Sequence, residues 1–237
     1  MLQVTRHSDV SVVAHVFTER FGCVPFVARR PRCGRGGGVA SALLQPLSQL
    51  TLECSRPGGV MQRLVGAELG PAYVSIPFVP AKSAVAMFLS EFLWKALRRE
   101  EPSAGLYEFV ALSLQWFDEA EEGYANFHII FLLQLTRYLG YDPTMLPEAR
   151  EYDIATLMRH NYRSMRLIPL NGEQRSGFLE RLVGFYGEMM PEMGEVKSLG
   201  VLGGMFREAS SPPPTPPEMG GGKPPSDSPR SGGRDWV

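Results

Sequence analysis

The spacing of apolar residues along the chain changes once, close to Pro80. Before this residue, apolar side chains recur at every second position, which is the period of a β-strand. The segment DVSVVAHVF shows this best, with Val10, Val12, Ala14 and Val16 on one face and Val13, His15 and Phe17 on the other. Further strands are predicted over CVPFVA, over residues 50–54 and over MQRLVGAEL after the turn signal RPGG. Short strands at this spacing suggest a small barrel or sandwich, and five strands in about seventy residues would suit an OB-fold barrel.

After Pro80 the period becomes 3.6 residues, which is that of an amphipathic helix. The first helix is predicted to begin at Pro80 and to end before Pro102, with Val85, Phe88, Leu89, Phe92, Leu93 and Ala96 on its apolar face. A second helix is predicted over residues 104–119. The third, YANFHIIFLLQLTRYLG, is apolar on most faces and is expected to form the buried centre, with Gly140 ending it. Further helices are predicted over residues 153–166, 173–189 and 195–206.

The last part of the chain has a different composition. Residues 210–237 contain eight prolines and five glycines, a proportion that predicts a disordered segment. The fold class predicted from these patterns is α+β, with three parts. Residues 1–78 form an OB-fold β-barrel, residues 79–207 form an all-helical domain, and residues 208–237 form a disordered Pro/Gly-rich tail.

Basic residues are concentrated in the first third of the chain, although the formal net charge is only -1. Residues 1–80 contain eight basic and four acidic residues, and the remainder contains sixteen and twenty-one. This asymmetry indicates a basic module on a more neutral scaffold. The three cysteines have no metal-binding spacing and are expected to be reduced thiols in a cytoplasmic protein. Neither a transmembrane run nor a secretory signal is expected.

The strongest local feature is the stretch VARRPRCGRGGG, which contains Arg29, Arg30, Arg32 and Arg35. Its glycines do not complete a dinucleotide fingerprint, because Val39 occupies the third glycine position, and no Walker lysine follows. Four guanidinium groups within seven residues repel one another unless an anion lies nearby. A nucleic-acid backbone would supply such an anion, and a solvated charged loop is the alternative.

The sequence offers little support for catalysis. Four acids cluster in DEAEEG (Asp118, Glu119, Glu121 and Glu122) and could hold Mg²⁺, but they also precede a helix, whose dipole favours negative charge there. The four histidines have no ligand-like partner nearby in sequence, and no nucleophile motif is present. The helical part is therefore interpreted as a scaffold or docking domain, and we expect neither an enzyme nor a cofactor.

Several longer segments together resemble the RecO family of DNA repair proteins in its Bacteroidetes form. They are ALLQPLSQLTLE, SIPFVPAKSAVAMFLSEFLWKALRREEP, EEGYANFHIIFLLQLTRYLGYDP, LMRHNYRSMRL and GEVKSLGVLGGMF. The resemblance extends from Met1 to about Phe206. It implies an OB-fold followed by a helical domain, and a cytoplasmic, nucleoid-associated recombination mediator without enzymatic turnover. Such proteins bind single- and double-stranded DNA, anneal complementary strands, and act with RecR in the RecF pathway to load RecA onto DNA coated by single-strand binding protein (SSB).

The resemblance also implies roles for particular residues. The basic loop belongs to the OB-fold, so the predicted DNA-binding residues are Arg29, Arg30, Arg32 and Arg35, extended by Arg20, Arg56 and Arg63. A groove for the C-terminal tail of SSB is expected in the helical domain, and two basic rims are candidates: Lys95, Arg98 and Arg99 near Trp94, or Arg159, Arg163 and Arg166. The sequence does not choose between them.

The chain departs from the family in three respects, one of which is that residues 143–153 look shortened and a Pro/Gly-rich tail is added. Many relatives have a four-cysteine zinc site, but no cysteine follows Cys54, so zinc is not expected. Met1 falls inside the family's first strand, so the expected barrel either lacks part of that strand or begins upstream of Met1. A protein-interaction adaptor whose barrel binds DNA poorly is therefore the alternative function, and a Mg²⁺-dependent nucleic-acid enzyme is a more distant one.

Overall fold

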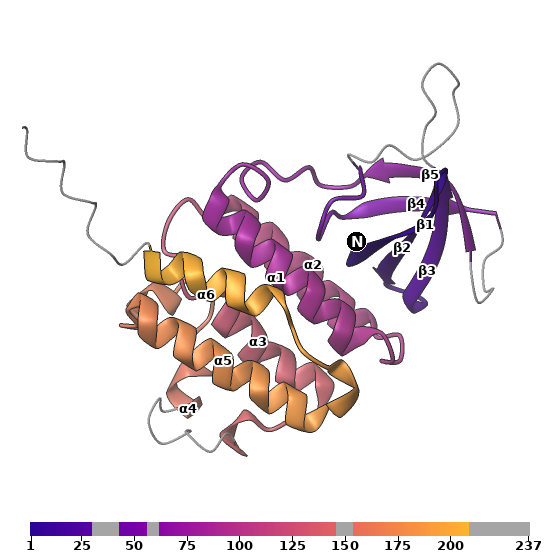
Figure 1. Ribbon diagram of the computed structural model, residues 1–237. Helices are drawn as coiled ribbons and strands as arrows, with labels where there is room; N and C mark the ends of the chain where they lie inside the picture. The colour runs from indigo at the N-terminus through magenta and orange to yellow at the C-terminus, as the bar shows by residue number, and fades with distance from the viewer. Residues whose placement is uncertain (30–42, 56–61, 146–153, 209–237) are drawn as a thin grey trace, which may run out of the picture.

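The computed structural model describes residues 1–29, 43–55, 62–145 and 154–208 of the 237 in the chain. An N-terminal β-sheet is followed by a helical region, and the two parts pack side by side (Figure 1). The predicted α+β class is confirmed, and the change of period near Pro80 coincides with the first residue of the first helix.

The sheet has five strands in the order β1-β2-β3-β5-β4. Neighbouring strands are antiparallel except for β3 and β5, which are parallel. The strands are β1 (Gln3–Ser8), β2 (Ser11–Thr18), β3 (Gly22–Arg29), β4 (Leu50–Cys54) and β5 (Gln62–Leu69). The four segments with alternating apolar residues thus correspond to β2 to β5. The sequence pattern did not identify β1, because QVTRHS has no apolar alternation.

The β-barrel predicted for residues 1–78, with part of its first strand missing, is not closed in this structure. No strand pairing joins β1 to β4 within the described residues, so both are edge strands. Just before the two strands, the Met1 nitrogen donates to the Ser48 carbonyl, and the Met1 carbonyl accepts from the nitrogen of Leu47. The physical reason lies in β1, where every residue after Gln3 is exposed. A strand with so little apolar surface to bury gains little from closing over the inner face.

The two faces of the sheet pack against different partners. Its inner face forms a small apolar core, built from Val12, Ala14, Val16, Val24, Phe26, Ala28 and Leu64 with Met1. On the opposite face of β2, Phe17 joins the main core of the helical region, and the His15 ring lies 4.0 Å from the ring of Trp94 in the first helix. The sheet and the helices therefore share a packed boundary.

The helical region contains six α-helices among the described residues. They are α1 (Pro80–Leu97), α2 (Ala104–Glu119), α3 (Phe127–Leu139), α4 (Ile154–Leu157), α5 (Gly172–Met189) and α6 (Ser198–Glu208). Short 3-10 turns cover Pro143–Met145, Met165–Leu167 and Pro191–Met193. The predictions for the first, second and fifth of these helices match closely, and Gly140 ends α3 in the left-handed conformation, as expected.

The prediction of one helix over residues 153–166 is wrong. The structure has the single turn of α4 and then an irregular segment. The side-chain oxygen of Asn161 accepts hydrogen bonds from the main-chain nitrogens of Arg163 and Ser164. These bonds replace helical ones, which is the usual way in which asparagine breaks a helix.

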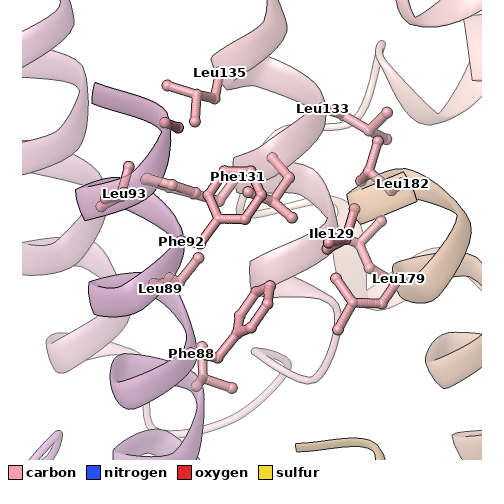
Figure 2. Packing of buried hydrophobic residues seen from close by; sticks show 14 of the residues in the cluster. Phe88, Leu89, Phe92, Leu93, Ile129, Phe131, Leu133, Leu135, Leu179 and Leu182 are labelled. Carbon is pink, nitrogen blue, oxygen red and sulfur yellow. The ribbon is translucent and has the colours of Figure 1, made fainter. Parts of the chain in front are cut away.

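Helix α3 lies at the centre of the helical core, as its all-round apolar sequence predicts. Figure 2 shows its side chains between those of α1 and α5. None of the labelled residues is exposed: Phe88, Leu89, Phe92 and Leu93 from α1, Ile129, Phe131, Leu133 and Leu135 from α3, and Leu179 and Leu182 from α5. Among the described helices, none is both long and apolar enough to cross a lipid bilayer.

Candidate nucleic-acid interface

Two of the predicted DNA-binding arginines lie on neighbouring strands at one end of the sheet. Arg29 is the last residue of β3, and Arg63 is the second residue of β5. The parallel register pairs Val27 with Arg63, so both arginines lie on the outer face, where both are exposed. Adjacent strands are about 4.8 Å apart, which brings the two guanidinium groups within reach of the same or neighbouring phosphates.

An open hollow of about 460 Å³ lies between these arginines. His7, Val10, Ser11, Val27 and Gln62 complete its lining, so no acid takes part among the residues that the structure describes. Within the described part of the chain, neither guanidinium forms an ion pair, whereas nearby Arg6 is paired with Asp9 at 2.5 Å. The hollow is therefore a small basic surface of the kind that an anion would neutralise.

Four further arginines of the predicted interface lie outside the described residues. Arg30, Arg32 and Arg35 belong to residues 30–42, and Arg56 belongs to residues 56–61. Chain connectivity still restricts where these segments begin and end. The first leaves the sheet directly after Arg29, and the second joins it directly before Gln62, which is paired with Phe26 of β3. Both segments therefore attach at the basic end of the sheet.

Arg20 lies at the opposite end. It is in the hairpin between β2 and β3, where Thr18 pairs with Gly22, whereas Ser11 pairs with Arg29 at the other end. The length of β2 separates the two ends by about 24 Å at 3.4 Å per residue. The structure therefore does not bring Arg20 to the hollow. It lies beside Phe21, whose side chain is 51% exposed, and both line a separate hollow on the open side of the sheet.

Phe17 and Phe26, two aromatic residues near the basic segment, belong to the cores, since they are 6% and 4% exposed. Of the three phenylalanines that the sequence places near the arginines, only Phe21 presents its ring to solvent. Base stacking at this sheet would therefore depend on Phe21.

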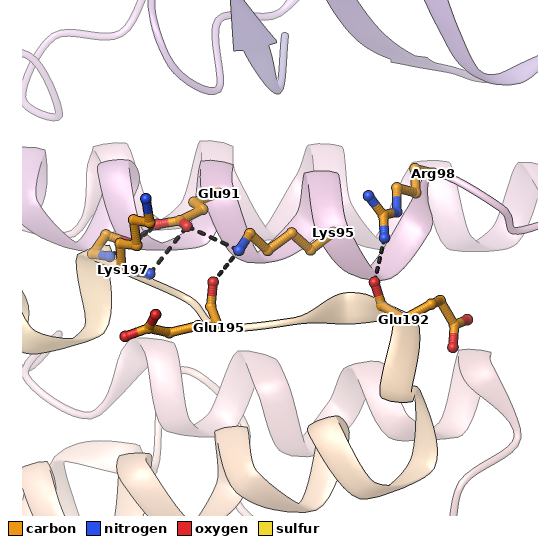
Figure 3. Close-up of polar contacts among 7 residues, drawn as sticks. Glu91, Lys95, Arg98, Glu192, Glu195 and Lys197 are labelled. Carbon is orange, nitrogen blue, oxygen red and sulfur yellow. Dashed lines mark hydrogen bonds and ion pairs between the residues drawn. The ribbon is translucent and has the colours of Figure 1, made fainter.

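In the first basic rim predicted in the helical region, two of the three side chains form contacts within the protein. Lys95 forms a 3.2 Å ion pair with Glu91 and donates a hydrogen bond to the main-chain oxygen of Glu195. Arg98 donates to the main-chain oxygen of Glu192 (Figure 3). Both side chains therefore attach the segment that connects α5 to α6 to the surface of α1. Arg99 is exposed at the end of the same helix.

Arg159, Arg163 and Arg166 of the second rim are all exposed. Arg159 and Arg163 lie between α4 and the turn Met165–Leu167, and Arg166 lies in that turn beside Leu167, which is 69% exposed. An exposed apolar residue beside three cations has the chemistry that an acidic, apolar-tipped peptide would need.

The acidic cluster is divided by the structure. Glu119, Glu121 and Glu122 are exposed, but Asp118 is buried, and its carboxylate accepts hydrogen bonds from the main-chain nitrogens of Val74, Ser75 and Ile76 at 2.7 to 2.8 Å. Burial tends to raise the pKa of this carboxyl, but these hydrogen bonds lower it below its usual range. Asp118 therefore fixes the connection between the sheet and the helices.

No group of acids, cysteines and histidines suited to a metal ion occurs among the described residues.

Sequence reasoning missed His7, Ser11 and Gln62 as lining of the basic hollow. These residues come from three different strands, and no local pattern connects them. A signal was available only for Arg63, because in QRLVGAEL it alternates with the buried residues Gln62 and Leu64 and must therefore face outward.

Comparison with known proteins adds an independent observation. Residues 78–170, from the start of α1 to the segment before α5, match a family model described as "Recombination protein O C terminal". The chain is also similar to proteins named "DNA repair protein RecO". The relative from Bacteroides fragilis is 31% identical over 234 residues, and that from Phocaeicola vulgatus is 29% identical over 233. The one from Christiangramia forsetii is 28% identical over 231 residues. Each alignment covers 87% of this chain and 96% of the relative.

Proposed function

The chain belongs to the RecO family, and from this premise we propose that it is a recombination mediator of DNA repair whose N-terminal sheet binds DNA. The observation that supports DNA binding most directly is the position of Arg29 and Arg63 on the neighbouring strands β3 and β5, where both line an open hollow that contains no acid among the described residues. Arginine suits this role because its planar fork can donate two hydrogen bonds to one phosphate.

The proposed interface is formed where the end of β3 and the start of β5 line this hollow. Arg29 and Arg63 form its fixed part, and Arg30, Arg32, Arg35 and Arg56 extend it in the segments that leave the sheet there. Arg20 and Phe21 form a second contact at the far hairpin, reached only by a strand that runs along the sheet. Binding is expected to be independent of base sequence, since phosphates supply the contacts, and to accept both single- and double-stranded DNA.

We also propose that residues 1–78 are an OB-fold whose sheet is open between β1 and β4. The parallel β3–β5 pair between antiparallel neighbours supports this assignment, because a five-stranded Greek-key sheet needs one such crossover. Residues 79–207 then form the helical domain, and residues 208–237 are an appended tail.

The helical domain is proposed to bind partner proteins. In this scheme the protein anneals complementary strands and, together with RecR, helps to load RecA onto SSB-coated DNA, with a functional link to RecF. It performs no chemistry of its own and acts in the cytoplasm at the nucleoid. Of the two rims for the SSB tail, we favour Arg159, Arg163 and Arg166, because all three are exposed and close in sequence to the exposed Leu167.

A strand-annealing assay on SSB-coated oligonucleotides, with and without RecR, tests the proposal. The protein should accelerate annealing, and the double variant Arg29→Ala/Arg63→Ala should lose most of that acceleration. If the wild-type protein fails to shift single-stranded DNA in a gel, the protein-interaction adaptor becomes the better description. If it cuts DNA when Mg²⁺ is added, the assignment as a non-catalytic mediator is wrong.

A further inference from the structure

An apolar groove of about 330 Å³ lies where the sheet, the segment before α1 and the first turns of α1 meet. Among the described residues, no charged side chain lines its walls. They are formed by Gln45, Pro46, Ser48, Leu69, Pro71, Ala72, Tyr73, Ile76, Pro77, Ser83, Ala86 and Met87. A groove of this size lies at the lower end of the range that binds small ligands or short peptide segments, which is about 300 to 1,000 Å³.

Large apolar side chains remain exposed at this groove. Met87 is 58% and Leu69 is 46% exposed, and both line it. Val74 and Phe78, which directly follow lining residues in the sequence, are 72% and 76% exposed. An apolar surface with several large side chains in solvent marks an interaction site rather than an ordinary face of a monomer.

Hydrogen bonds keep the walls in place without an occupant. The Tyr73 hydroxyl donates to the carbonyl of Leu47 at 3.0 Å, and the Ser83 hydroxyl donates to the carbonyl of Ile76 at 2.7 Å. The Asp118 carboxylate accepts from the nitrogens of residues 74–76. The groove is therefore formed before anything binds, which lowers the cost of binding.

The C-terminal helix leads toward this groove. Glu91 of α1 accepts hydrogen bonds from the nitrogens of Lys197 and Ser198 and thereby fixes the start of α6. Figure 3 shows the preceding segment passing along α1 from Arg98 toward Glu91, and Figure 1 shows the end of α6 on the side where α1 begins. Met87 lies one helical turn before Glu91, so the groove opens beside the path of α6.

The segment that follows α6 has a composition that matches the groove. Residues 209–237 extend beyond the described part of the chain, and their first stretch, SSPPPTPP (210–217), has five prolines and no charge. Proline-rich segments bind apolar grooves well because their backbone is already restricted and loses little entropy. We propose that residues 210–217 of the same chain bind in the groove between Leu69 and Met87.

Because residues 210–217 belong to the same chain as the groove, even a weak affinity is sufficient for them to occupy it. A short connection within one chain gives an effective concentration of about 1 mM, so a segment that binds with a dissociation constant of about 0.1 to 1 mM is bound at least half of the time. The bound tail would cover Met87 and Leu69 and compete with any other protein for this surface. A second copy of the chain is the rival occupant.

Hydrogen–deuterium exchange on the full-length protein tests the proposal. The matched comparison is a full-length variant in which Pro212, Pro213, Pro214, Pro216 and Pro217 are all replaced by glycine. Amides of residues 71–87 should exchange about two- to tenfold more slowly in the wild-type protein than in this variant, the ratio expected from the occupancy above. Met87→Glu should remove the protection, because it places a charge in an apolar groove. Val201→Glu, at a residue of α6 that is 63% exposed and does not line the groove, should not.

Two further measurements separate the tail from the rival occupant. A synthetic peptide of residues 209–220, added to the glycine variant, should restore the protection. The protection should not depend on protein concentration, and sedimentation should show no dimer that Met87→Glu dissociates. Equal exchange in wild-type protein and glycine variant would overturn the proposal, and so would protection that rises with protein concentration, since that identifies a second copy as the occupant.

Discussion

The ammonium group of Lys82 donates a hydrogen bond to the main-chain oxygen of Asp118 at 3.0 Å. The carboxylate of Asp118 in turn accepts a hydrogen bond from the main-chain nitrogen of Ser75. Lys82 is 2% exposed, and it also donates to the Ser75 hydroxyl and the Ala120 carbonyl. Its nitrogen lies 4.8 Å from the centre of the Tyr124 ring. Burial lowers the pKa of this lysine, although the nearby Asp118 and Glu121 carboxylates raise it. The pair connects the end of α2, the start of α1 and the segment that leads from the sheet.

Replacement of Asp118 by asparagine should destabilise the protein strongly. The amide cannot match the three main-chain donors that the carboxylate satisfies, and Lys82 loses a carboxylate whose charge favours its protonated form. The expected loss in the free energy of unfolding is about 2 to 3 kcal/mol. Urea denaturation measures it. The matched control is Glu119→Gln, next to it but exposed, which should change stability by less than about 0.5 kcal/mol. Equal effects of the two variants would contradict the structural role of Asp118.

The stability of the protein should fall as the pH is lowered from neutrality, because of His128. This residue of α3 is 0% exposed, and burial, followed by the charge of Arg175, lowers its pKa to about 3. The unfolded chain takes up a proton near pH 6.5, whereas the folded chain does so only near pH 3. The stabilisation is therefore complete above pH 6.5 and is lost progressively down to pH 3, with a slope of at most about 1.4 kcal/mol per pH unit.

Denaturation of the variant His128→Gln at several pH values checks this origin. The variant should have a lower stability at pH 7.5 and a shallower decline between pH 6.5 and pH 4. The variant His160→Gln, at a half-buried histidine on the surface of the helical region, serves as the control and should keep the wild-type slope. If His128→Gln kept the full slope, another group would be responsible for the pH dependence.

Loss of the Glu91 side chain should loosen the C-terminal helix. Its carboxylate accepts hydrogen bonds from the nitrogens of Lys197 and Ser198 and from the Ser198 hydroxyl at 2.7 to 3.0 Å, so it acts as the N-terminal cap of α6 from another helix. Glu91→Ala should cost about 1 to 2 kcal/mol and accelerate amide exchange in α6. Glu188→Ala, at an exposed position of α5, is the control. Unchanged exchange in α6 would show that other contacts hold this helix.

Replacement of Arg29 and Arg63 together by alanine should weaken binding to single-stranded DNA and reduce its salt dependence. Two fewer phosphate contacts lower the slope of log affinity against log salt by about 1.4, at about 0.7 per contact. At low salt, affinity should fall about tenfold, which corresponds to about 1.4 kcal/mol. A fluorescence titration at several salt concentrations measures both. As a control, Arg163→Ala removes an exposed arginine of the helical region and should leave the salt slope unchanged. If the double variant kept the wild-type salt slope, the hollow would be excluded as a phosphate site.

The periodicity of the sequence predicted the elements well where one interaction determines them. In α3 nearly every side chain is apolar, so only a central position can bury them all. In β2 to β5 the alternation with period two distinguishes an inner from an outer face. The prediction failed where polar residues decide the local structure, as at β1, whose sequence shows no apolar alternation, and at Asn161, which interrupts a helical pattern.

The sequence by itself determined the α+β class, the position near Pro80 where strands give way to helices, and the outward orientation of Arg63, because each depends on the local spacing of apolar side chains. Only the tertiary structure decided that Arg29 and Arg63 are neighbours, since their strands pair across more than thirty residues. It also decided that Lys82 is buried and that the sheet stays open at β1 and β4. These features depend on which distant groups can satisfy a buried charge or a strand edge, and that information is not present in any local segment.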